Sequence, residues 1–414
     1  MDDKSTNGID KSRCGWTDLE TWVREHVQRF IQGLLEDEVT ELLARGKHER
    51  RAAVDAPAGY RNGYGKPRRL TLSCGTVELC RPRVRGIEAR FESRLLPLFA
   101  KRTKHVRELL PDLYLHGLAL GDFELALGGL LGDGAALSPS TIARLKTKWQ
   151  SEYEAWCTER LDELEPVYLW VDGVYVKAGL EKDKAALLVV IAGCADGHKR
   201  LVALSAGHRE SEAAWSAVLR DLKWRGLGCP KLVEGDGHLG IWAGLRNVYP
   251  EAAEQRCWNH RIVNVLDKVP KRLQARARAQ ITQIPYAGAE REALELRERF
   301  QGWCRANHLD EAAALIERDW DRMVTFYRFP REHWTHLRTT NVVESPFGAL
   351  RLRTDAAKRF KKVESATAVI FKMLKVAESR FRRLNAPELL RELALGAEFK
   401  DGLRVQHHPE EAAA

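Results

Sequence analysis

The stretch Val-Tyr-Leu-Trp-Val-Asp-Gly-Val-Tyr-Val, residues 167–176, decides the fold of this chain. Its β-branched and aromatic residues are typical of a buried strand. Asp172 interrupts the apolar run near its centre. A carboxylate inside a buried strand costs free energy unless it is paired or binds a metal. The stretch therefore predicts a core strand that carries a functional acid.

The segments after this strand predict the rest of a sheet. An Asp-Gly turn between two apolar runs indicates a hairpin. The predicted elements are strands 166–177, 186–194 and 199–205, a helix from Ser211 to about Arg225, strand 231–235, helix 238–248 and a strand near 254–257. The order β-β-β-α-β-α-β predicts an α/β core of ribonuclease-H-like fold, a mixed sheet flanked by helices. In that architecture one acid belongs in the middle of the first strand and another at the end of the fourth, where Asp172 and Asp236 lie.

A third acid, Glu344, ends the stretch Thr-Thr-Asn-Val-Val-Glu, where a helix begins. Three carboxylates can converge on hard cations, which take oxygen ligands and also hold phosphate oxygens. Two such metals are used to cleave and transfer phosphodiesters. The sequence therefore predicts two ions, Mg²⁺ or Mn²⁺, held by Asp172, Asp236 and Glu344.

Each acid also has a structural interpretation. Asp172 would be satisfied by hydrogen bonds or an arginine. Asp236 lies between two glycines and would suit a turn. Glu344 would complete a capping box if Asn341 were the N-cap residue. Glu234, two residues before Asp236, is a competing ligand on the same strand face.

The bulk composition predicts a cytoplasmic protein of two or three domains. The chain has 414 residues, of which 44% are hydrophobic and 30% charged. It contains no apolar run of about 18 residues and no signal peptide in Met-Asp-Asp-Lys-Ser, so we expect no membrane partner. Its eight cysteines form no Cys-x-x-Cys pair, which favours reduced thiols over disulfides or a zinc ribbon.

Positive charge is concentrated directly after the third acid. The net charge is +9, and residues 345–384 carry eleven Lys and Arg against three acids. A basic stretch is often a solvated helix face. Beside a carboxylate cluster, it instead favours a polyanionic substrate. The predicted phosphate contacts are Arg351, Arg353, Lys358 and Arg359.

The first 150 residues predict a mostly helical DNA-binding region. A helix is expected over 16–43, loop or extended chain to Arg69, and a small basic hairpin around Gly75. Residues 104–150 are predicted to be helical, and the last helix is predicted to start at Ser138-Pro139. This pattern fits a helix-turn-helix motif, although small helical hairpins imitate it. Its predicted DNA contacts are Ser140, Thr141, Arg144 and Lys148.

The chain divides into six predicted segments. Residues 262–335 interrupt the core with helical sequence at 273–281, 291–303 and 310–323, which predicts an inserted all-α subdomain. The segments are 1–103, the N-terminal helix with its basic loop and hairpin; 104–164, the helix-turn-helix-like helices; 165–261, the first part of the core; 262–335, the insertion; 336–384, the basic C-terminal helices of the core; and 385–414, a frayed tail.

Three sequence blocks resemble the Mutator-type transposases of bacterial insertion sequences, which have a DDE active site on a ribonuclease-H-like fold. The blocks are Gly-Asp-Gly-His-Leu-Gly (235–240), Gln-Arg-Cys-Trp-Asn-His-Arg-Ile-Val-Asn-Val-Leu (255–266) and His-Trp-Thr-His-Leu-Arg-Thr-Thr-Asn-Val-Val-Glu-Ser (333–345). The block Arg-Asn-Gly-Tyr (61–64) is also similar to the family's N-terminal region. The resemblance covers about residues 55–385.

The resemblance implies that Asp172, Asp236 and Glu344 are the catalytic triad. It also implies a supporting Cys-x-x-His element, here Cys257 and His260, and an upstream tryptophan, here Trp334. We expect the Cys-His pair to brace the neighbours of Asp236, because a structural zinc site needs four ligands. Trp334 could stack on an extruded base or join the insertion to the core. Arg61 is a further expected DNA contact.

The expected function is a transposase that binds the terminal inverted repeats of its element and catalyses metal-dependent strand cleavage and transfer. Its partners would be double-stranded DNA, both repeats and target, and a second copy or more of this chain. It would act in the bacterial cytoplasm, on the nucleoid when bound to DNA. The alternatives are a non-catalytic DNA-binding regulator of transposase ancestry and a metal-dependent nuclease without joining activity.

Overall fold

The computed structural model describes residues 18–51, 53–88, 90–97, 100–119, 122–131, 139–179, 184–207, 211–237 and 239–406. The chain forms two compact units, Met1–Ala143 and Arg144–Ala414, so the unit boundary falls within a helix, α4 (Pro139–Cys157). None of the helices in the described ranges is both long and apolar enough to cross a membrane. We describe each unit by itself.

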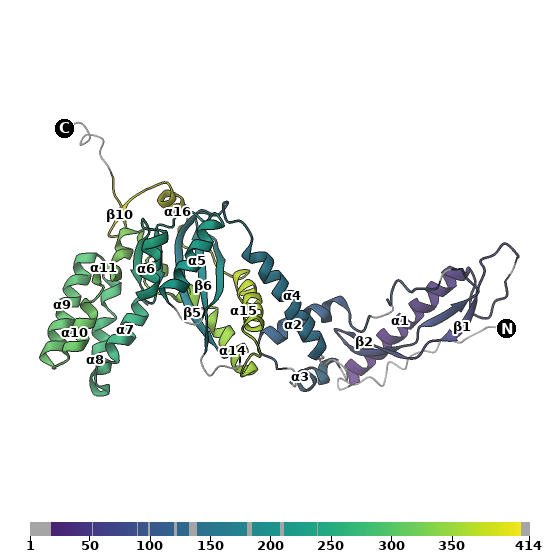
Figure 1. Ribbon diagram of the computed structural model, residues 1–414. Helices are drawn as coiled ribbons and strands as arrows, with labels where there is room; N and C mark the ends of the chain where they lie inside the picture. The colour runs from purple at the N-terminus through teal and green to yellow at the C-terminus, as the bar shows by residue number, and fades with distance from the viewer. Residues whose placement is uncertain are drawn as a thin grey trace. The chain divides into compact units, whose positions relative to one another are not determined.

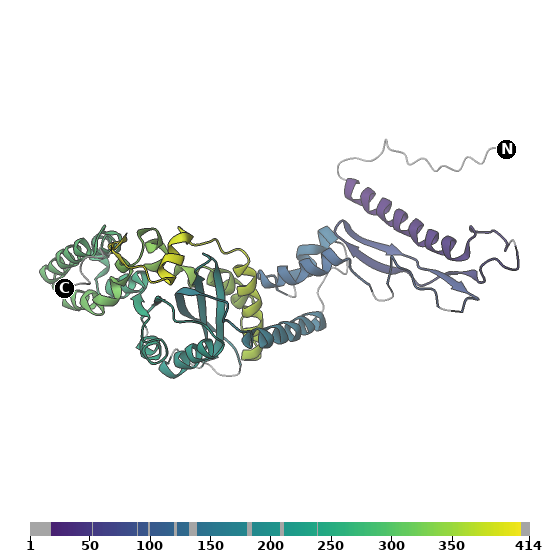
Figure 2. The same cartoon turned by 90° about the horizontal axis from the view of Figure 1, so that it is seen from above.

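The first unit joins a long helix to two strand pairs. In both views, helix α1 runs along the strands of this unit (Figures 1 and 2). The elements are α1 (Leu19–Leu43), β1 (Tyr60–Tyr64), β2 (Arg68–Leu72), β3 (Gly75–Leu79), β4 (Pro82–Arg85), α2 (Lys104–Leu115) and α3 (Asp122–Leu131). Leu35 of α1 packs with Leu70, Val77 and Leu79 of the hairpin and with Leu96. This small core anchors the helix to the strands.

The predicted hairpin is confirmed, and a second strand pair accompanies it. Strands β2 and β3 are antiparallel, with Leu72 opposite Gly75. Gly75 has a φ of 124°, where an added Cβ would lie 2.4 Å from the Cδ of Arg24, so only glycine fits. The preceding segment, predicted as loop or extended chain, contains β1, which pairs antiparallel with β4.

The second unit is built on a five-stranded mixed sheet in the order β7-β6-β5-β8-β9. The strands are β5 (Pro166–Val176), β6 (Ala185–Cys194), β7 (Lys199–Gly207), β8 (Leu232–Gly235) and β9 (Ala253–Arg256). Strand β6 is antiparallel to both β5 and β7, whereas β8 is parallel to β5 and β9 is parallel to β8. This mixed α/β sheet agrees with the predicted strands to within one or two residues.

Helices cover both faces of this sheet (Figures 1 and 2). On one face, α5 (Glu212–Trp224) and α6 (Leu239–Val248) pack against alternate β5 residues, Leu169 and Val171. On the opposite face, α13 (Asn341–Glu344) contacts β5 and β6, and α15 (Val363–Glu378) contacts β7. The residues of β5 between the core positions, including Asp172, therefore point to the face that carries α13.

The region predicted as an insertion is helical but more broken than expected. Its helices are α7 (Trp258–Leu266), α8 (Lys271–Ile281), α9 (Glu290–Ala306), α10 (Asp310–Glu317) and α11 (Trp320–Met323). The 3-10 turn η3 (Ile284–Tyr286) lies between α8 and α9, and the 3-10 turns η4 (Thr325–Arg328) and η5 (Arg331–His333) follow α11. One helix was predicted over 310–323. It is interrupted at Asp319, which has a φ of 62° and binds three arginines.

The chain returns to the sheet through short helices. These are α12 (Trp334–Leu337), α13, α14 (Phe347–Ala357) and α15. The last segment was predicted as a frayed tail, but its described part contains α16 (Pro387–Ala394) and a small strand pair, β10 (Phe399–Lys400) and β11 (Leu403–Arg404). Leu390 and Leu393 are buried, so apolar packing orders this segment.

Candidate active site

Asp172 lies on β5 in a half-buried position opposite Val189 of β6. Its Oδ1 accepts a 2.7 Å hydrogen bond from the Gly173 N–H. The pKa of the Asp172 carboxyl is raised to about 7: burial is the largest cause, the charges of Asp236 and Glu344 act in the same direction, and the Gly173 N–H and His260 oppose the shift. Asp172 is therefore a carboxylate with too little positive charge around it.

Asp236 follows β8 directly. The parallel register of β5 and β8 places Trp170 opposite Glu234. Continuing that register by two residues brings Asp236 to the level of Asp172 on the same face. Gly237 makes the tight exit from the strand possible, because its φ is 94° and an added Cβ would lie 2.2 Å from the Nε of Arg256.

Glu234 competes poorly with Asp236 as a ligand. Its side chain is fully buried, and burial raises its pKa well above the usual value for a glutamate. Burial therefore favours its neutral form, whereas a hard cation prefers an ionised oxygen ligand. Asp236 is only half-buried. The structure thus favours Asp236 over its neighbour.

Glu344 is the last residue of α13, which contacts β5. Its N–H donates to the Thr340 carbonyl at 2.9 Å, and its Oε1 accepts from the Thr340 hydroxyl. The prediction that Asn341 caps this helix is wrong, because Thr340 occupies the N-cap position. The Oδ1 of Asn341 instead accepts from Asn259 at 3.3 Å.

Cys257 connects the segments that carry the second and third acids. Its N–H donates to the carbonyl of Gly235, the residue before Asp236, at 2.8 Å. Its Sγ lies 3.2 Å from the Thr340 hydroxyl and accepts from the Thr340 N–H at 3.3 Å. Burial raises the pKa of this thiol, and its hydrogen bonds with Thr340 oppose the shift. These contacts agree with the predicted bracing role.

His260 completes this group from the next turn of α7. Its Nδ1 lies 3.8 Å from Glu344 Oε1. Ligand atoms of Cys257, His260 and Glu344 all lie within 4.8 Å of one another, which is close enough to share a cation. In the described part of the chain, this is where candidate metal-ligating side chains of at least three residues converge. The motif residues therefore adjoin Glu344, whereas Asp172 and Asp236 lie outside this group of ligand atoms.

Two predicted DNA contacts are buried. Trp334 is 3% exposed; its indole N–H donates to the Phe329 carbonyl at 2.9 Å, and its ring packs edge-on against Tyr327. This arrangement favours the alternative of a core tryptophan over base stacking. Arg353 is also 3% exposed and so is not presented to a phosphate in this conformation. Arg351, Lys358 and Arg359 are exposed, as a phosphate contact requires.

The remaining predicted contacts lie on α4 and β1. Ser140, Arg144 and Lys148 are exposed on α4 and Thr141 is half-buried, although Lys148 also pairs with Glu152 at 3.6 Å. Residues 132–138, the expected turn of the helix-turn-helix, lie outside the described residues, so that motif stays a prediction.

Arg61 has a structural partner that the sequence did not indicate. It donates to Glu36 at 2.9 Å and to the Thr40 hydroxyl at 2.7 Å, and therefore ties β1 to α1. Thr340 was also missed. It occurs in an ordinary polar stretch, and only the fold brings it between Cys257 and Glu344.

Comparisons with known proteins show the family of this chain. The family described as "Transposase, Mutator family" matches residues 7–383. The chain is 43% identical to the transposase for insertion sequence element IS6120 of Mycolicibacterium smegmatis, over 71% of this chain and 91% of that protein. It is 40% identical to the transposase for element IST2 of Acidithiobacillus ferrooxidans, over 67% and 94% respectively. The chain belongs to the Mutator family of transposases.

Proposed function

We propose that this protein is a DDE transposase that binds the terminal inverted repeats of its insertion sequence and catalyses metal-dependent strand cleavage and transfer. One observation supports the proposal: the charges of Asp236, directly after β8, and of Glu344, on α13, both act on the carboxyl of Asp172 on β5. The strand order β7-β6-β5-β8-β9, with its antiparallel and parallel halves, supports a ribonuclease-H-like core.

The residues fit a pair of divalent cations, Mg²⁺ or Mn²⁺. Burial and the charges of the neighbouring carboxylates together raise the pKa of Asp172 to about 7. A bound cation would favour the ionised form and remove that repulsion. Asp172, Asp236 and Glu344 would supply the oxygen ligands that such ions prefer. When bound, the ions supply Lewis-acid chemistry for attack on a phosphodiester.

The side chains of the protein would then hold and orient the reacting groups. The Thr340 hydroxyl fixes the Glu344 carboxylate, and Cys257 fixes Thr340 relative to the Gly235 carbonyl. Water attacks the phosphodiester at the element's end, and the freed 3′-hydroxyl then attacks target DNA. No covalent protein–DNA intermediate is needed, so no serine or tyrosine nucleophile is invoked. The protein would act as a homodimer or larger assembly on DNA, in the bacterial cytoplasm.

The test uses purified protein, DNA that carries its own element's ends, a target plasmid, and Mg²⁺ or Mn²⁺. Wild type is compared with Asp236→Asn and with a matched control, Asp267→Asn, which changes an exposed acid on the end of α7. We expect joined products from wild type and the control, and none from Asp236→Asn, with end binding largely retained. Near-normal joining by Asp236→Asn would refute the assignment.

Two other activities give different results in the same assay. Metal-dependent cleavage without joining would indicate a nuclease. Binding by folded protein without any metal-dependent chemistry would indicate a regulator of transposase ancestry. We favour the transposase because the three acids and their supporting contacts are intact.

A further inference from the structure

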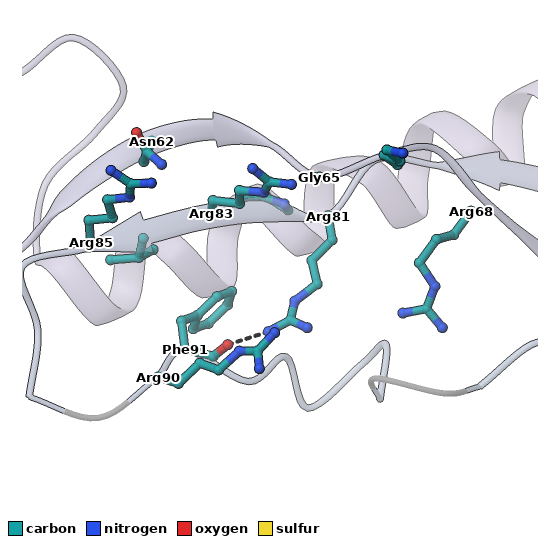
Figure 3. Close-up of a pocket in the computed structure, with 11 residues that line it drawn as sticks. Asn62, Gly65, Arg68, Arg81, Arg83, Arg85, Arg90 and Phe91 are labelled. Atoms are coloured by element: carbon teal, nitrogen blue, oxygen red, sulfur yellow. Dashed lines mark hydrogen bonds between the residues drawn. The ribbon is translucent and has the colours of Figure 1, made fainter.

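A hollow in the first unit is lined by positive charge. It has a volume of about 680 Å³ and lies against β1 and β4 (Figure 3). Among the residues that the structure describes, those that line it include no acid and six basic residues: Lys66, Arg68, Arg81, Arg83, Arg85 and Arg90. A solvated surface usually mixes charges of both signs. The composition of this hollow therefore favours an anionic ligand.

Strand periodicity generates this concentration of charge. Arg83 and Arg85 are alternate residues of β4, so both side chains leave the same face of the strand. The Gly65 N–H donates to the Arg81 carbonyl at 2.8 Å, which joins the end of β1 to the chain before β4. Gly65 has no side chain to fill the space, and a Cβ there would lie 3.8 Å from the Nε of Arg83.

Two of the arginines already have structural partners. Arg81 lies over the Phe91 ring, 5.6 Å from its centroid, and donates to the Phe91 carbonyl. Arg68 donates to the Ala100 carbonyl at 2.9 Å. Figure 3 shows the guanidinium groups of Arg81 and Arg90 turned toward one another beside Phe91. Burial, then Arg90, lowers the pKa of Arg81, as expected where cations crowd together.

The other three arginines are available to a ligand. Arg83, Arg85 and Arg90 are exposed, and none of them forms an ion pair with a residue that the structure describes. Their guanidinium groups are spread along the strands and do not converge on one point (Figure 3). This distribution suits an extended polyanion better than a single small anion.

We propose that this hollow binds the phosphate backbone of duplex DNA and positions it without reading its sequence. Alternate strand residues are about 6.8 Å apart, and a DNA strand offers one phosphate per about 3.4 Å of helix axis. Planar guanidinium groups match phosphate oxygens in pairs. Such contacts set the register of a protein on DNA but carry no sequence information. The choice of DNA as the polyanion rests on the proposed function.

The experiment measures DNA affinity of the full chain over a range of salt concentrations. The test variant is Arg83→Gln/Arg85→Gln/Arg90→Gln. The control, Lys271→Gln/Arg272→Gln/Arg278→Gln, removes three exposed charges from α8. A second variant changes the same three pocket arginines to lysine, which keeps the charge. The probes are duplexes with the element's end and duplexes of random sequence.

Each phosphate contact contributes about 0.9 to the slope of log affinity against log salt concentration. We expect the glutamine variant to lower that slope by about 2 to 3 on both duplexes, and the lysine variant and the α8 control to keep it. An unchanged slope, or an equal loss in the α8 control, would overturn the pocket assignment. A loss confined to the element's end would indicate sequence reading and overturn the backbone role.

These outcomes are distinct from failure of the proposed function. If wild type binds and joins DNA while the glutamine variant keeps the wild-type salt slope, the proposed transposase function is supported and the pocket assignment is refuted. If wild type neither binds nor cuts DNA, the proposed function falls first, and the pocket assignment falls with it. Thermal unfolding of each variant checks that the substitutions leave the unit folded.

Discussion

At the scale of single residues, the position of Glu344 depends on Thr340. The threonine hydroxyl donates to the Glu344 carboxylate and also contacts Cys257 Sγ at 3.2 Å. Groups that orient metal ligands typically change metal affinity or activity by about 10- to 100-fold when removed. We therefore expect Thr340→Val to lower strand cleavage by about this factor, with the deficit largest at low Mg²⁺ concentration. Cleavage measured against Mg²⁺ concentration checks this.

A matched threonine provides the control for this prediction. Thr282 donates to the Arg278 carbonyl at 2.7 Å at the end of α8, remote in sequence from the three acids. Thr282→Val should leave the Mg²⁺ dependence unchanged. If both variants kept wild-type cleavage at all Mg²⁺ concentrations, Thr340 would have no role in positioning Glu344.

His336 makes stability depend on pH. Burial, then the charge of Lys199, lowers its pKa from 6.5 to about 4. The folded protein therefore keeps this histidine neutral while the unfolded chain takes up a proton below pH 6.5. Stability is unaffected above pH 7 and falls as pH drops from about 6.5 to about 4, by at most about 3 kcal/mol. Urea unfolding at several pH values measures this loss.

The comparison of variants isolates the contribution of His336. We expect His336→Gln to show a shallower loss of stability over that pH range, whereas the exposed His308→Asn should follow wild type. His308 has a φ of 60°, which asparagine tolerates. Parallel curves for wild type and His336→Gln would show that other groups cause the pH dependence.

At the scale of elements, Asp319 separates α10 from α11 and fastens both to the sheet. Its Oδ2 accepts from Arg256 at 2.7 Å and from Arg261 at 2.8 Å, and its Oδ1 accepts from Arg322 at 3.0 Å. Arg261 is 1% exposed, so losing this partner leaves a buried charge uncompensated. We expect Asp319→Asn to destabilise the protein by about 2 to 3 kcal/mol. Denaturant unfolding against the exposed Asp310→Asn control measures this, and equal stability of both variants would contradict it.

Elements with a strong local signal were predictable, and those set by distant contacts were not. Strands β5 to β7 follow from runs of apolar residues and the Asp196-Gly197 turn. The break at Asp319 was missed because helical periodicity continues through it, and its cause is an ion cluster with residues about 60 positions earlier. The packing of α16 was missed because a helix of eight residues is too short to show a clear helical period.

The same distinction applies to the site. The positions of Asp172 within β5 and of Asp236 directly after β8 could be predicted from the strand pattern, and the parallel register brings them to one level of the sheet. The burial of Trp334 and Arg353 could not be predicted, because an aromatic or basic residue in a helical pattern suits a core as well as a DNA surface. The role of Thr340 could not be found because its contact with Cys257, 83 positions earlier, exists only in the folded chain.

At the scale of the whole molecule, each unit has an apolar core of its own. Leu35, Leu70 and Val77 belong to the small core of the first unit, and the much larger core around β5 belongs to the second. Units with separate cores unfold in separate steps when few contacts join them. We therefore expect two calorimetric transitions, with the first unit unfolding at the lower temperature because it buries less apolar surface.

Metal binding should distinguish the two transitions, because the three proposed ligands, Asp172, Asp236 and Glu344, all belong to the second unit. A ligand at 100 times its dissociation constant stabilises the folded state by about 2.7 kcal/mol. For a unit of this size, that corresponds to an upward shift of about 5 to 10 °C. Mg²⁺ or Mn²⁺ should therefore raise only the upper transition, and Asp236→Asn should abolish most of the shift. An equal shift of both transitions, or one retained in Asp236→Asn, would place the metal elsewhere and separate the cation from the three carboxylates.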